Sequence, residues 1–258
     1  MAATANLVEV FSSIQGEGIH VGASTVFVRF GRCDLRCRWC DSPHTWKPAD
    51  AGSVTELDGS EHPFENPVPV DTVLAWLERF ELEQHRFVSF TGGEPLLQSK
   101  AVAALAAGLR GRGPRRFLET HGLAREGLAE VLPEIDVVSM DWKLASEVRR
   151  EGASHRDARE AFHATHAAFL REALGSAEAV VKVVVTPATE NAELDAMLEA
   201  VVGVDASVPV ILQPVTPTGP VRAAPRPDQV LAWHRRLERG GLRDVRSIPQ
   251  THKTIGLA

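Results

Sequence analysis

The stretch STVFVRFGRCDLRCRWCDS at residues 24–42 joins an apolar, β-branched run to three closely spaced cysteines. The run at 24–30 predicts a β-strand, because β-branched and aromatic side chains pack well on a pleated surface. The loop that follows, 31–46, holds every cysteine of the chain. A buried strand that leads directly into a cysteine loop is therefore the feature around which the rest of the sequence is interpreted.

Further apolar runs alternate with amphipathic stretches along the chain. Strands are predicted at 24–30, 86–90, 115–119, 136–140, 179–185, 208–213 and 244–248, and helices at 70–80, 99–110, 157–174, 192–202 and 228–239. Strand–helix alternation with short connections favours βαβ units and a mainly parallel sheet. We predict an α/β fold, a partial (β/α)6 barrel formed as one domain over residues 1–258. The polar segment 47–69 is expected to be a surface insertion. The Pro-rich segment 214–228 is expected to be a stiff connection, with a lid as the alternative.

Composition and charge exclude several classes of protein. The 258 residues are enough to bury a large core, and 44% hydrophobic with 24% charged residues is ordinary for a soluble globular protein. The net charge of −6 provides no broad basic field, so no nucleic-acid partner is expected. The sequence contains no run of about 18 apolar residues and no signal-type start, so we expect no membrane span and a cytoplasmic location.

Cys33, Cys37 and Cys40 have the spacing C-x3-C-x2-C. Three cysteines in so short a window cannot pair off as disulfides, which points to metal or redox chemistry. Such a loop can wrap three soft, anionic thiolates around one face of a 4Fe–4S cluster and leave one iron without a protein ligand. The alternative is a zinc site with His44 as the fourth ligand, because structural zinc sites use four ligands.

Polar clusters follow several of the predicted strands. They are TGGEP (91–95), ETHG (119–122), SMDWK (139–143), QPVTP (213–217) and QTHK (250–253). The carboxyl ends of parallel strands meet at one edge of a sheet or one mouth of a barrel, where such folds build their sites. We therefore expect these clusters to surround one site.

The cysteine motif is the signature of the radical S-adenosylmethionine (SAM) superfamily, and the resemblance extends beyond it. Trp39 lies directly before the last cysteine, and a GGEP motif (92–95) follows the next predicted strand. The segments FSSIQGEG (11–18), CDSPHTW (40–46), TGGEPLLQ (91–98), LQP (212–214) and QTHK together resemble the 7-carboxy-7-deazaguanine synthase family, from about residue 8 to the C-terminus.

This resemblance implies a lyase of queuosine and deazapurine biosynthesis. The family converts 6-carboxy-5,6,7,8-tetrahydropterin to 7-carboxy-7-deazaguanine with loss of ammonia, using a 4Fe–4S cluster, SAM and Mg²⁺. An electron from the cluster cleaves SAM, the resulting radical abstracts hydrogen from C6 of the pterin, and the ring contracts. Because the cofactor supplies the hydrogen abstractor, no catalytic side chain is expected beyond it. An external electron donor such as flavodoxin and a homodimer are also implied.

The resemblance also assigns residues to the site. SAM contacts fall on Trp39, Asp41, Gly93, Glu94, Glu119, Ser139, Lys143 and Gln213, and substrate contacts fall on Ile14, Gln15, Gly16, Glu17, Arg29, Thr91, His252 and the terminal Ala258. An amide such as that of Gln15 can both donate to and accept from a pyrimidine edge, and Arg29 suits a carboxylate. Ser42 stands where the family usually has a threonine that ligates Mg²⁺, an ion that prefers oxygen donors. The family's lysine follows its serine within two residues, whereas three residues separate Lys143 from Ser139.

Two alternatives from other classes stay open at this point. Another short radical SAM enzyme, such as a glycyl-radical activase, would act on a protein partner and would not need the IQGEG loop or the QTHK terminus. A non-catalytic cluster protein would be expected to have a fourth cysteine. His155, His163 and His166 are expected at solvated helix positions.

Overall fold

The computed structural model describes residues 3–153 and 162–257. The strands are β1 (Thr4–Ala5), β2 (Leu7–Ile14), β3 (Ser24–Phe30), β4 (Leu35–Cys37), β5 (Ala51–Thr55), β6 (Glu61–Glu65), β7 (Val68–Pro69), β8 (Phe87–Gly92), β9 (Arg115–Thr120), β10 (Val137–Asp141), β11 (Val148–Arg150), β12 (Glu178–Val185), β13 (Val210–Pro214) and β14 (Val245–Ser247). The α-helices are α1 (Val70–Leu77), α2 (Ser99–Gly108), α3 (Arg125–Val131), α4 (His163–Leu174), α5 (Asn191–Val202), α6 (Pro227–Arg239) and α7 (Thr251–Ile255).

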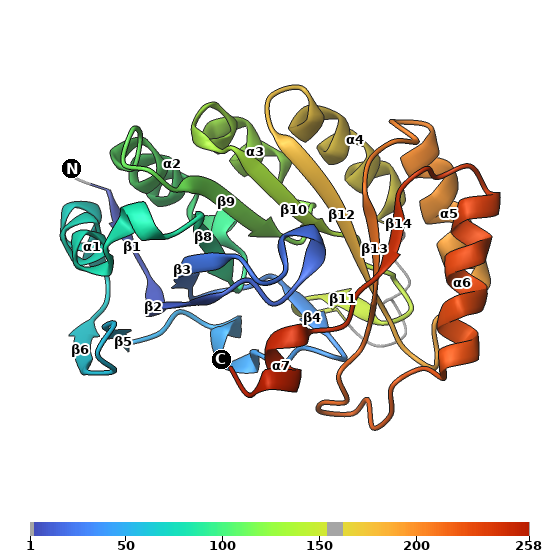
Figure 1. Cartoon of the computed structure of the whole chain (residues 1–258), viewed down its shortest axis with the longest axis horizontal. Coiled ribbons are helices and arrows are strands. Elements are labelled where there is room, and N and C mark those ends of the chain that lie inside the picture. Colours follow the sequence, from blue (N-terminus) through green and yellow to red (C-terminus); the bar gives the residue numbers. More distant parts are fainter. Residues whose placement is uncertain (1–2, 154–161, 258) are drawn as a thin grey trace.

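The main sheet has ten strands in the order β14-β13-β12-β10-β9-β8-β3-β2-β5-β6. Every pair from β3 to β14 is parallel, and a helix lies between each of these strands and the next in the chain. All seven predicted strands are therefore confirmed, and so is the partial (β/α)6 barrel (Figure 1). The sheet stays open because β14 and β6 form its two edges.

The N-terminal edge of the sheet differs from the sequence prediction. Strand β2 was not predicted, yet it pairs antiparallel with β3, and β5 and β6 extend the sheet beyond it. The segment 47–69, expected to be only a surface insertion, therefore contributes a hairpin to the main sheet. Its strands, AGSVT and EHPFE, are short and mix small, polar and apolar residues, so no apolar alternation marks them in the sequence.

The predicted helix at 157–174 is shorter in the described residues. Helix α4 begins at His163, and Phe162 directly before it is not helical. Residues 157–161 lie outside the described part of the chain. No helix in 3–153 or 162–257 is long and apolar enough to cross a membrane.

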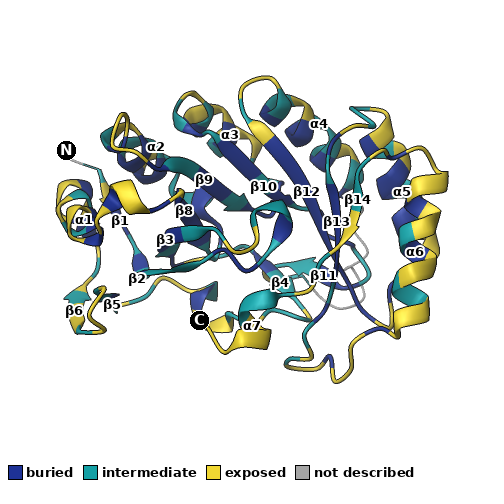
Figure 2. Ribbon diagram, in the orientation of Figure 1, coloured by how far each residue is buried: buried dark blue, intermediate teal, exposed yellow. Residues whose placement is uncertain are grey.

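The main hydrophobic core lies between one face of the sheet and helices α1–α6, which cover that face (Figures 1 and 2). Residues such as Val28, Leu118 and Val181 point from the strands into this layer, and Leu105 and Phe169 meet them from the helices. Each is completely buried. Burial of each such side chain contributes about 1.5–3 kcal/mol, so this layer supplies much of the stability of the fold.

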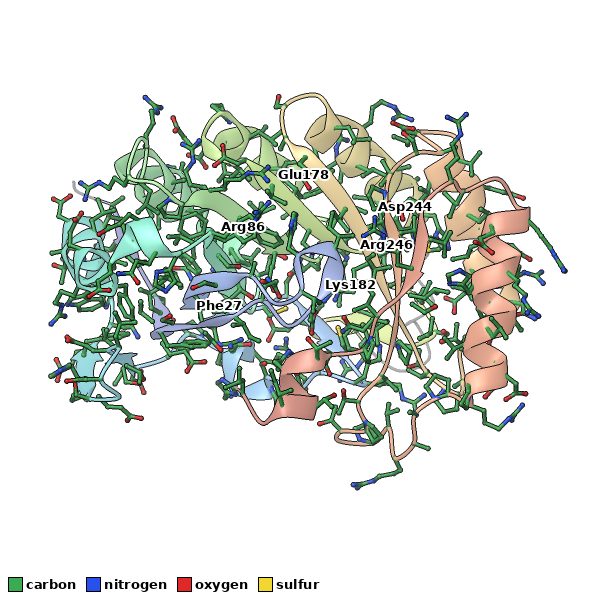
Figure 3. The ribbon with its side chains drawn as sticks, in the orientation of Figure 1. Phe27, Arg86, Glu178, Lys182, Asp244 and Arg246 are labelled. Carbon is green, nitrogen blue, oxygen red and sulfur yellow. The ribbon has the colours of Figure 1, made fainter. Side chains whose placement is uncertain are left out.

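The alternate positions of the same strands point to the inner, concave face. The strand register places Phe27, on β3, and Lys182, on β12, on this face (Figure 3). Near the amino ends of the strands, Phe87, Phe117 and Val137 pack together as a floor, with the two phenyl centroids 5.2 Å apart. The apolar floor closes the barrel below, and the polar positions above it face the mouth.

Of the histidines predicted as solvated, His166 lies in the interior and His163 is half-buried. His166 is completely buried, its Nε2 lies 3.0 Å from the carbonyl oxygen of His121, and its ring packs 4.7 Å from that of Trp142. His163 accepts a hydrogen bond from Trp142 Nε1 at Nδ1. Helical spacing could not reveal this, because α4 presents these rings to Trp142 rather than to water. His155 lies outside the described residues.

The buried His166 predicts a pH dependence of stability. Burial lowers the pKa of His166 to about 3, whereas an unfolded histidine titrates near 6.5. Between these values the unfolded state binds more protons, so the free energy of unfolding falls as pH falls from about 6.5 toward 3. His166→Gln keeps a donor and cannot titrate, and we expect a shallower loss in urea titrations over that range. The exposed His62→Gln is the control, and an equal slope in wild type and His166→Gln would contradict the prediction.

Candidate active site

A cavity of about 230 Å³ opens at the carboxyl ends of the barrel strands. Its wall brings together most of the residues predicted for the site: Ile14, Gln15, Gly16, Glu17, Arg29, Cys33, Cys37, Trp39, Cys40, Asp41, Ser42, Thr91, Gly93, Glu119, Lys143, Gln213 and His252. Glu94 and Ser139 do not line it, and Ala258 lies outside the described residues. The expectation that the polar clusters surround one site is therefore confirmed for all five clusters.

The cysteine loop is held by a two-stranded ribbon and by backbone hydrogen bonds. Strand β4 pairs antiparallel with β11, and the Cys33 amide donates to the Trp46 carbonyl over 3.2 Å. Behind the loop, Leu35, Val148 and Phe162 form a small apolar cluster on which Cys33, Cys37 and Trp39 pack. The loop therefore presents its three thiols to the cavity from a packed base.

Burial favours the neutral form of the three thiols. Burial raises the pKa of Cys33 to about 12 and that of Cys37 to about 11, and it also raises the pKa of Cys40. The Lys143 ammonium opposes this effect at all three sulfurs. A bound metal deprotonates its thiol ligands, so the set offers three soft anionic donors to a cluster. The residues present fit a 4Fe–4S group with one iron free of protein ligands.

The zinc alternative lacks its proposed fourth ligand. Structural zinc sites use four ligands, and the three cysteines supply only three. His44, the candidate for the fourth position, is exposed and does not line the cavity that the cysteines share.

The GGEP turn packs directly against the cysteine loop. A Cβ on Gly93 would lie 2.2 Å from the carbonyl oxygen of Arg32, and one on Gly92 would lie 2.4 Å from that of Phe30. Gly92 also has φ +112°, a conformation that favours glycine. Both glycines are therefore required by the approach of the turn to the protein's own backbone, in addition to any approach to a ligand.

Glu94 ties this turn to the ETHG turn. Its carboxylate is completely buried and accepts hydrogen bonds from Leu96 N, Thr120 Oγ1 and His121 N over 2.8–3.0 Å. His121 Nδ1 accepts from Leu123 N, so Nε2 carries the proton and donates to Asp34 Oδ1 over 2.8 Å. This network connects the two turns to the residue after Cys33 and places the Glu94 carboxylate away from the cavity.

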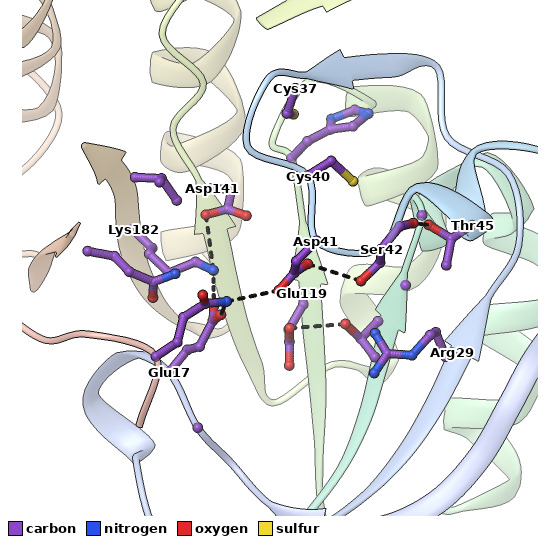
Figure 4. A pocket seen from close by; sticks show the side chains of 18 of the residues that line it. Glu17, Arg29, Cys37, Cys40, Asp41, Ser42, Thr45, Glu119, Asp141 and Lys182 are labelled. Carbon is purple, nitrogen blue, oxygen red and sulfur yellow. Dashed lines mark hydrogen bonds and ion pairs between the residues drawn. The ribbon is translucent and has the colours of Figure 1, made fainter. Parts of the chain in front are cut away.

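Glu119 hydrogen-bonds side chains that include two residues predicted to contact the substrate, Gln15 and Thr91. Its Oε1 accepts from Gln15 Nε2 (3.0 Å) and Ser89 Oγ (2.9 Å), and its Oε2 accepts from Thr91 Oγ1 (3.0 Å). Arg29 lies beside this group, bonded through Nε to Glu9 on the neighbouring strand and packed over the Phe11 ring. Of these side chains, Phe11, Gln15, Arg29, Thr91 and Glu119 line the cavity. Figure 4 shows Arg29 beside Glu119.

The sequence interpretation missed Lys182, and it placed Asp141 at the site only as part of SMDWK, without a role of its own. Lys182 Nζ forms ion pairs with Glu17 and with Asp141 Oδ1 (3.3 Å) (Figure 4). Lys143 Nζ contacts Asp141 Oδ2 over 2.9 Å. Burial alone would raise the pKa of Asp141, but the two lysines hold it below its usual value. A signal was present in the sequence, because AVVKVVV (179–185) places one charge inside an otherwise apolar strand.

The C-terminal segment closes one side of the cavity. The Thr251 amide donates to the Gly16 carbonyl over 2.9 Å, and Gln250 Nε2 donates to Glu17 (2.8 Å) and to Asp41 (3.1 Å). Lys253 pairs with Asp41 over 3.3 Å. The segment therefore joins the IQGEG loop to the end of the cysteine loop.

Gln213 carries an orphan acceptor. The residue is 3% exposed, lines the cavity, and its Oε1 has no hydrogen-bond partner among the described residues. A buried carbonyl oxygen without a partner costs about 1–3 kcal/mol, so it indicates a ligand that donates to it.

The fold and site together define a radical SAM enzyme, and comparisons with known proteins agree. The model of the Radical SAM superfamily matches residues 27–200. The crystal structure of QueE from Escherichia coli superposes with a TM-score of 0.63 at 22% identity, covering 96% of this chain and 95% of that chain, which supports the fold.

Curated relatives show which family of radical SAM enzymes the chain resembles. The 7-carboxy-7-deazaguanine synthase of Geobacter sulfurreducens is 35% identical over 98% of this chain and 97% of its own length. That of Methanopyrus kandleri is 35% identical over 97% and 93%. The chain belongs to the 7-carboxy-7-deazaguanine synthase family, the radical SAM lyases of deazapurine biosynthesis.

The contact of Gly93 with the cysteine loop gives a stability prediction. Gly93→Ala places a methyl group against the Arg32 carbonyl, so the turn and the loop must separate, at a cost of about 1–3 kcal/mol. Thermal unfolding measures this as a lower Tm. Gly175→Ala is the matched control, since its added Cβ would meet the Glu172 carbonyl oxygen at 3.3 Å in an ordinary helical conformation, and a shift of a few tenths of an ångström relieves that contact. Equal Tm changes in the two variants would refute the assignment.

Proposed function

We propose that the chain converts 6-carboxy-5,6,7,8-tetrahydropterin to 7-carboxy-7-deazaguanine with loss of ammonia. The observation that carries the proposal is that the wall of one cavity combines three cysteines, the IQGEG loop and the QTHK segment. In this proposal the cysteines hold the cluster. The IQGEG loop and the QTHK segment are not needed for the cluster or for SAM, so they indicate a particular substrate. Relatives that match nearly the whole chain bear the name of this activity. The names of these relatives also argue against the two alternatives, a glycyl-radical activase and a non-catalytic cluster protein.

Cys33, Cys37 and Cys40 hold the cluster in this proposal. When bound, the 4Fe–4S group and SAM supply an electron, reductive cleavage of SAM and abstraction of a hydrogen atom from the substrate. The protein orients the reacting groups and excludes water, which supplies much of the catalysis for a radical step. The apolar floor of Phe87, Phe117 and Val137 supports this role because it seals the barrel below the site.

The SAM side is formed by residues next to the cluster loop. Trp39, Asp41, Lys143, Gln213 and the backbone of Gly93 line the cavity there. The orphan Oε1 of Gln213 supports a contact with a donor group of SAM. Glu94 and Ser139, also predicted for SAM, act indirectly in this proposal, since neither lines the cavity.

The substrate side is formed by the opposite wall. Arg29 provides a guanidinium for the pterin carboxylate, and Gln15 and Glu17 provide amide and carboxylate groups for the pyrimidine edge. Glu119, predicted for SAM, hydrogen-bonds Gln15 and Thr91, and we therefore place it on this side. Ile14, Gly16 and His252 complete the wall.

Ser42 is the proposed Mg²⁺ ligand. It lines the cavity directly after the cysteine motif, and its hydroxyl donates to Asp41 Oδ1 over 3.0 Å. An oxygen donor beside a carboxylate suits Mg²⁺, which keeps several waters. The homodimer, the flavodoxin-type donor, the contact of Ala258 and the cytoplasmic location stay predictions.

Cys37→Ala tests the cluster and the reaction together. After anaerobic reconstitution we expect about four irons per wild-type chain, release of 5′-deoxyadenosine, and the deazaguanine product from the carboxy-tetrahydropterin. Cys37→Ala should lose the cluster absorbance and all turnover, because a thiolate ligand is removed. Ser60→Ala, in the β5–β6 turn, is the control. Wild-type protein that binds one zinc ion and does not cleave SAM would sink the proposal.

Ser42→Ala tests the magnesium site. We expect the variant to keep its cluster and to need a higher Mg²⁺ concentration for half-maximal turnover, because one oxygen ligand is lost. The measurement is the turnover rate against Mg²⁺ concentration, with wild type and Ser60→Ala alongside. If the Mg²⁺ response of Ser42→Ala equals that of wild type, Ser42 is not a ligand.

A further inference from the structure

Lys182 is a buried cation in the cavity wall to which none of the sequence motifs assigns a role. It lies on the inner face of β12, opposite Asp141 of β10 in the strand register, and only 8% of it is exposed. A lysine in such a place is costly unless its charge is paired. The groups that pair with the Lys182 ammonium therefore indicate the role of this residue.

The ammonium joins segments that are far apart in the sequence. Its Nζ contacts Glu17 Oε2, 165 positions away, and Asp141 Oδ1 at 3.3 Å. The other oxygen of Glu17 accepts from Gln250 Nε2 over 2.8 Å. One cation and one amide thus fix the orientation of the Glu17 carboxylate in the IQGEG loop.

Asp141 extends the connection to the cluster side. Its second oxygen contacts Lys143 Nζ at 2.9 Å, and that ammonium lies 4.6 Å from the centre of the Trp39 ring. A continuous path of contacts therefore runs from the cysteine loop to the substrate loop, with Lys182 as the step that reaches Glu17.

The charge of Lys182 favours a holding role over proton transfer. Burial alone would lower the pKa of Lys182, but Asp141 and Glu17 outweigh burial and raise it well above its usual value. An ammonium with so high a pKa stays charged at neutral pH and is a weak acid. It is suited to keep a neighbouring carboxylate ionised and in place.

We propose that Lys182 is a positioning residue that holds the Glu17 carboxylate as the acceptor for the amino edge of the substrate. This inference rests on the proposed function, because it gives Glu17 the pterin ring as its ligand. The loop has two further anchors, Gln15 on Glu119 and Gly16 on Thr251. Loss of Lys182 should therefore loosen Glu17 without unfolding the loop.

A double-mutant cycle on Lys182→Met and Glu17→Gln tests the coupling. Each single variant should raise KM for the carboxy-tetrahydropterin about tenfold or more, the loss expected for a hydrogen bond to a charged group, with a smaller change in kcat. The double variant should be no worse than the worse single variant, since both remove one interaction. Lys182→Arg should restore part of the affinity. The proposal would be overturned if the KM changes of the two single variants multiplied in the double variant. A fall in kcat with KM unchanged in Lys182→Met would overturn it as well.

A measurement without substrate separates this inference from the proposed function. Amide hydrogen exchange of residues 14–18 should be faster in Lys182→Met than in wild type, and Lys100→Met, on the exposed face of α2, should match wild type. Unchanged exchange in Lys182→Met overturns the positioning role even if the enzyme is active. A wild-type enzyme that makes no deazaguanine defeats the proposed function, while the exchange result still decides the role of Lys182. If Lys182→Met does not fold, the double variant, which removes both charges, carries the exchange measurement.

Discussion

Asp141 makes the contact on which the arrangement of the cavity depends, since its two carboxylate oxygens pair with two lysines on different segments. Lys143 lies toward the cysteine loop and Lys182 toward the IQGEG loop. Charges removed from water need partners, so these side chains can occupy the interior only together. The two sides of the cavity, one proposed for SAM and one for the pterin, are thereby held at a fixed relation.

A second constraint is the close approach of backbone segments at the mouth of the barrel. The GGEP turn lies so near strand β3 and the cysteine loop that side chains are excluded at Gly92 by the first and at Gly93 by the second. The buried carboxylate of Glu94 then fastens this turn to Thr120 and His121. A motif associated with cofactor binding thus also serves as a structural joint. Its glutamate contributes to the site by holding the walls together.

These constraints suit a reaction in which the cofactor supplies the reactive species. A radical SAM enzyme must hold the radical carbon derived from SAM close to the substrate carbon and must exclude water. The buried ion pairs of Asp141 suit the first task, and the apolar floor suits the second. The C-terminal segment adds to this enclosure, because Gln250, Thr251 and Lys253 bond to the IQGEG loop and to the end of the cysteine loop.

The sequence by itself determined the seven parallel strands, the cluster cysteines and most of the cavity wall. Buried parallel strands are continuous apolar runs, and metal ligands within one loop keep their spacing, so both are local signals. Only the tertiary structure decided that 51–65 extends the sheet, that His166 is buried, and that Glu94 and Ser139 lie outside the cavity wall. It also brought Lys182 to Glu17 and Asp141. Each of these features depends on which face a side chain presents to segments distant in the chain, and local periodicity does not encode that neighbour.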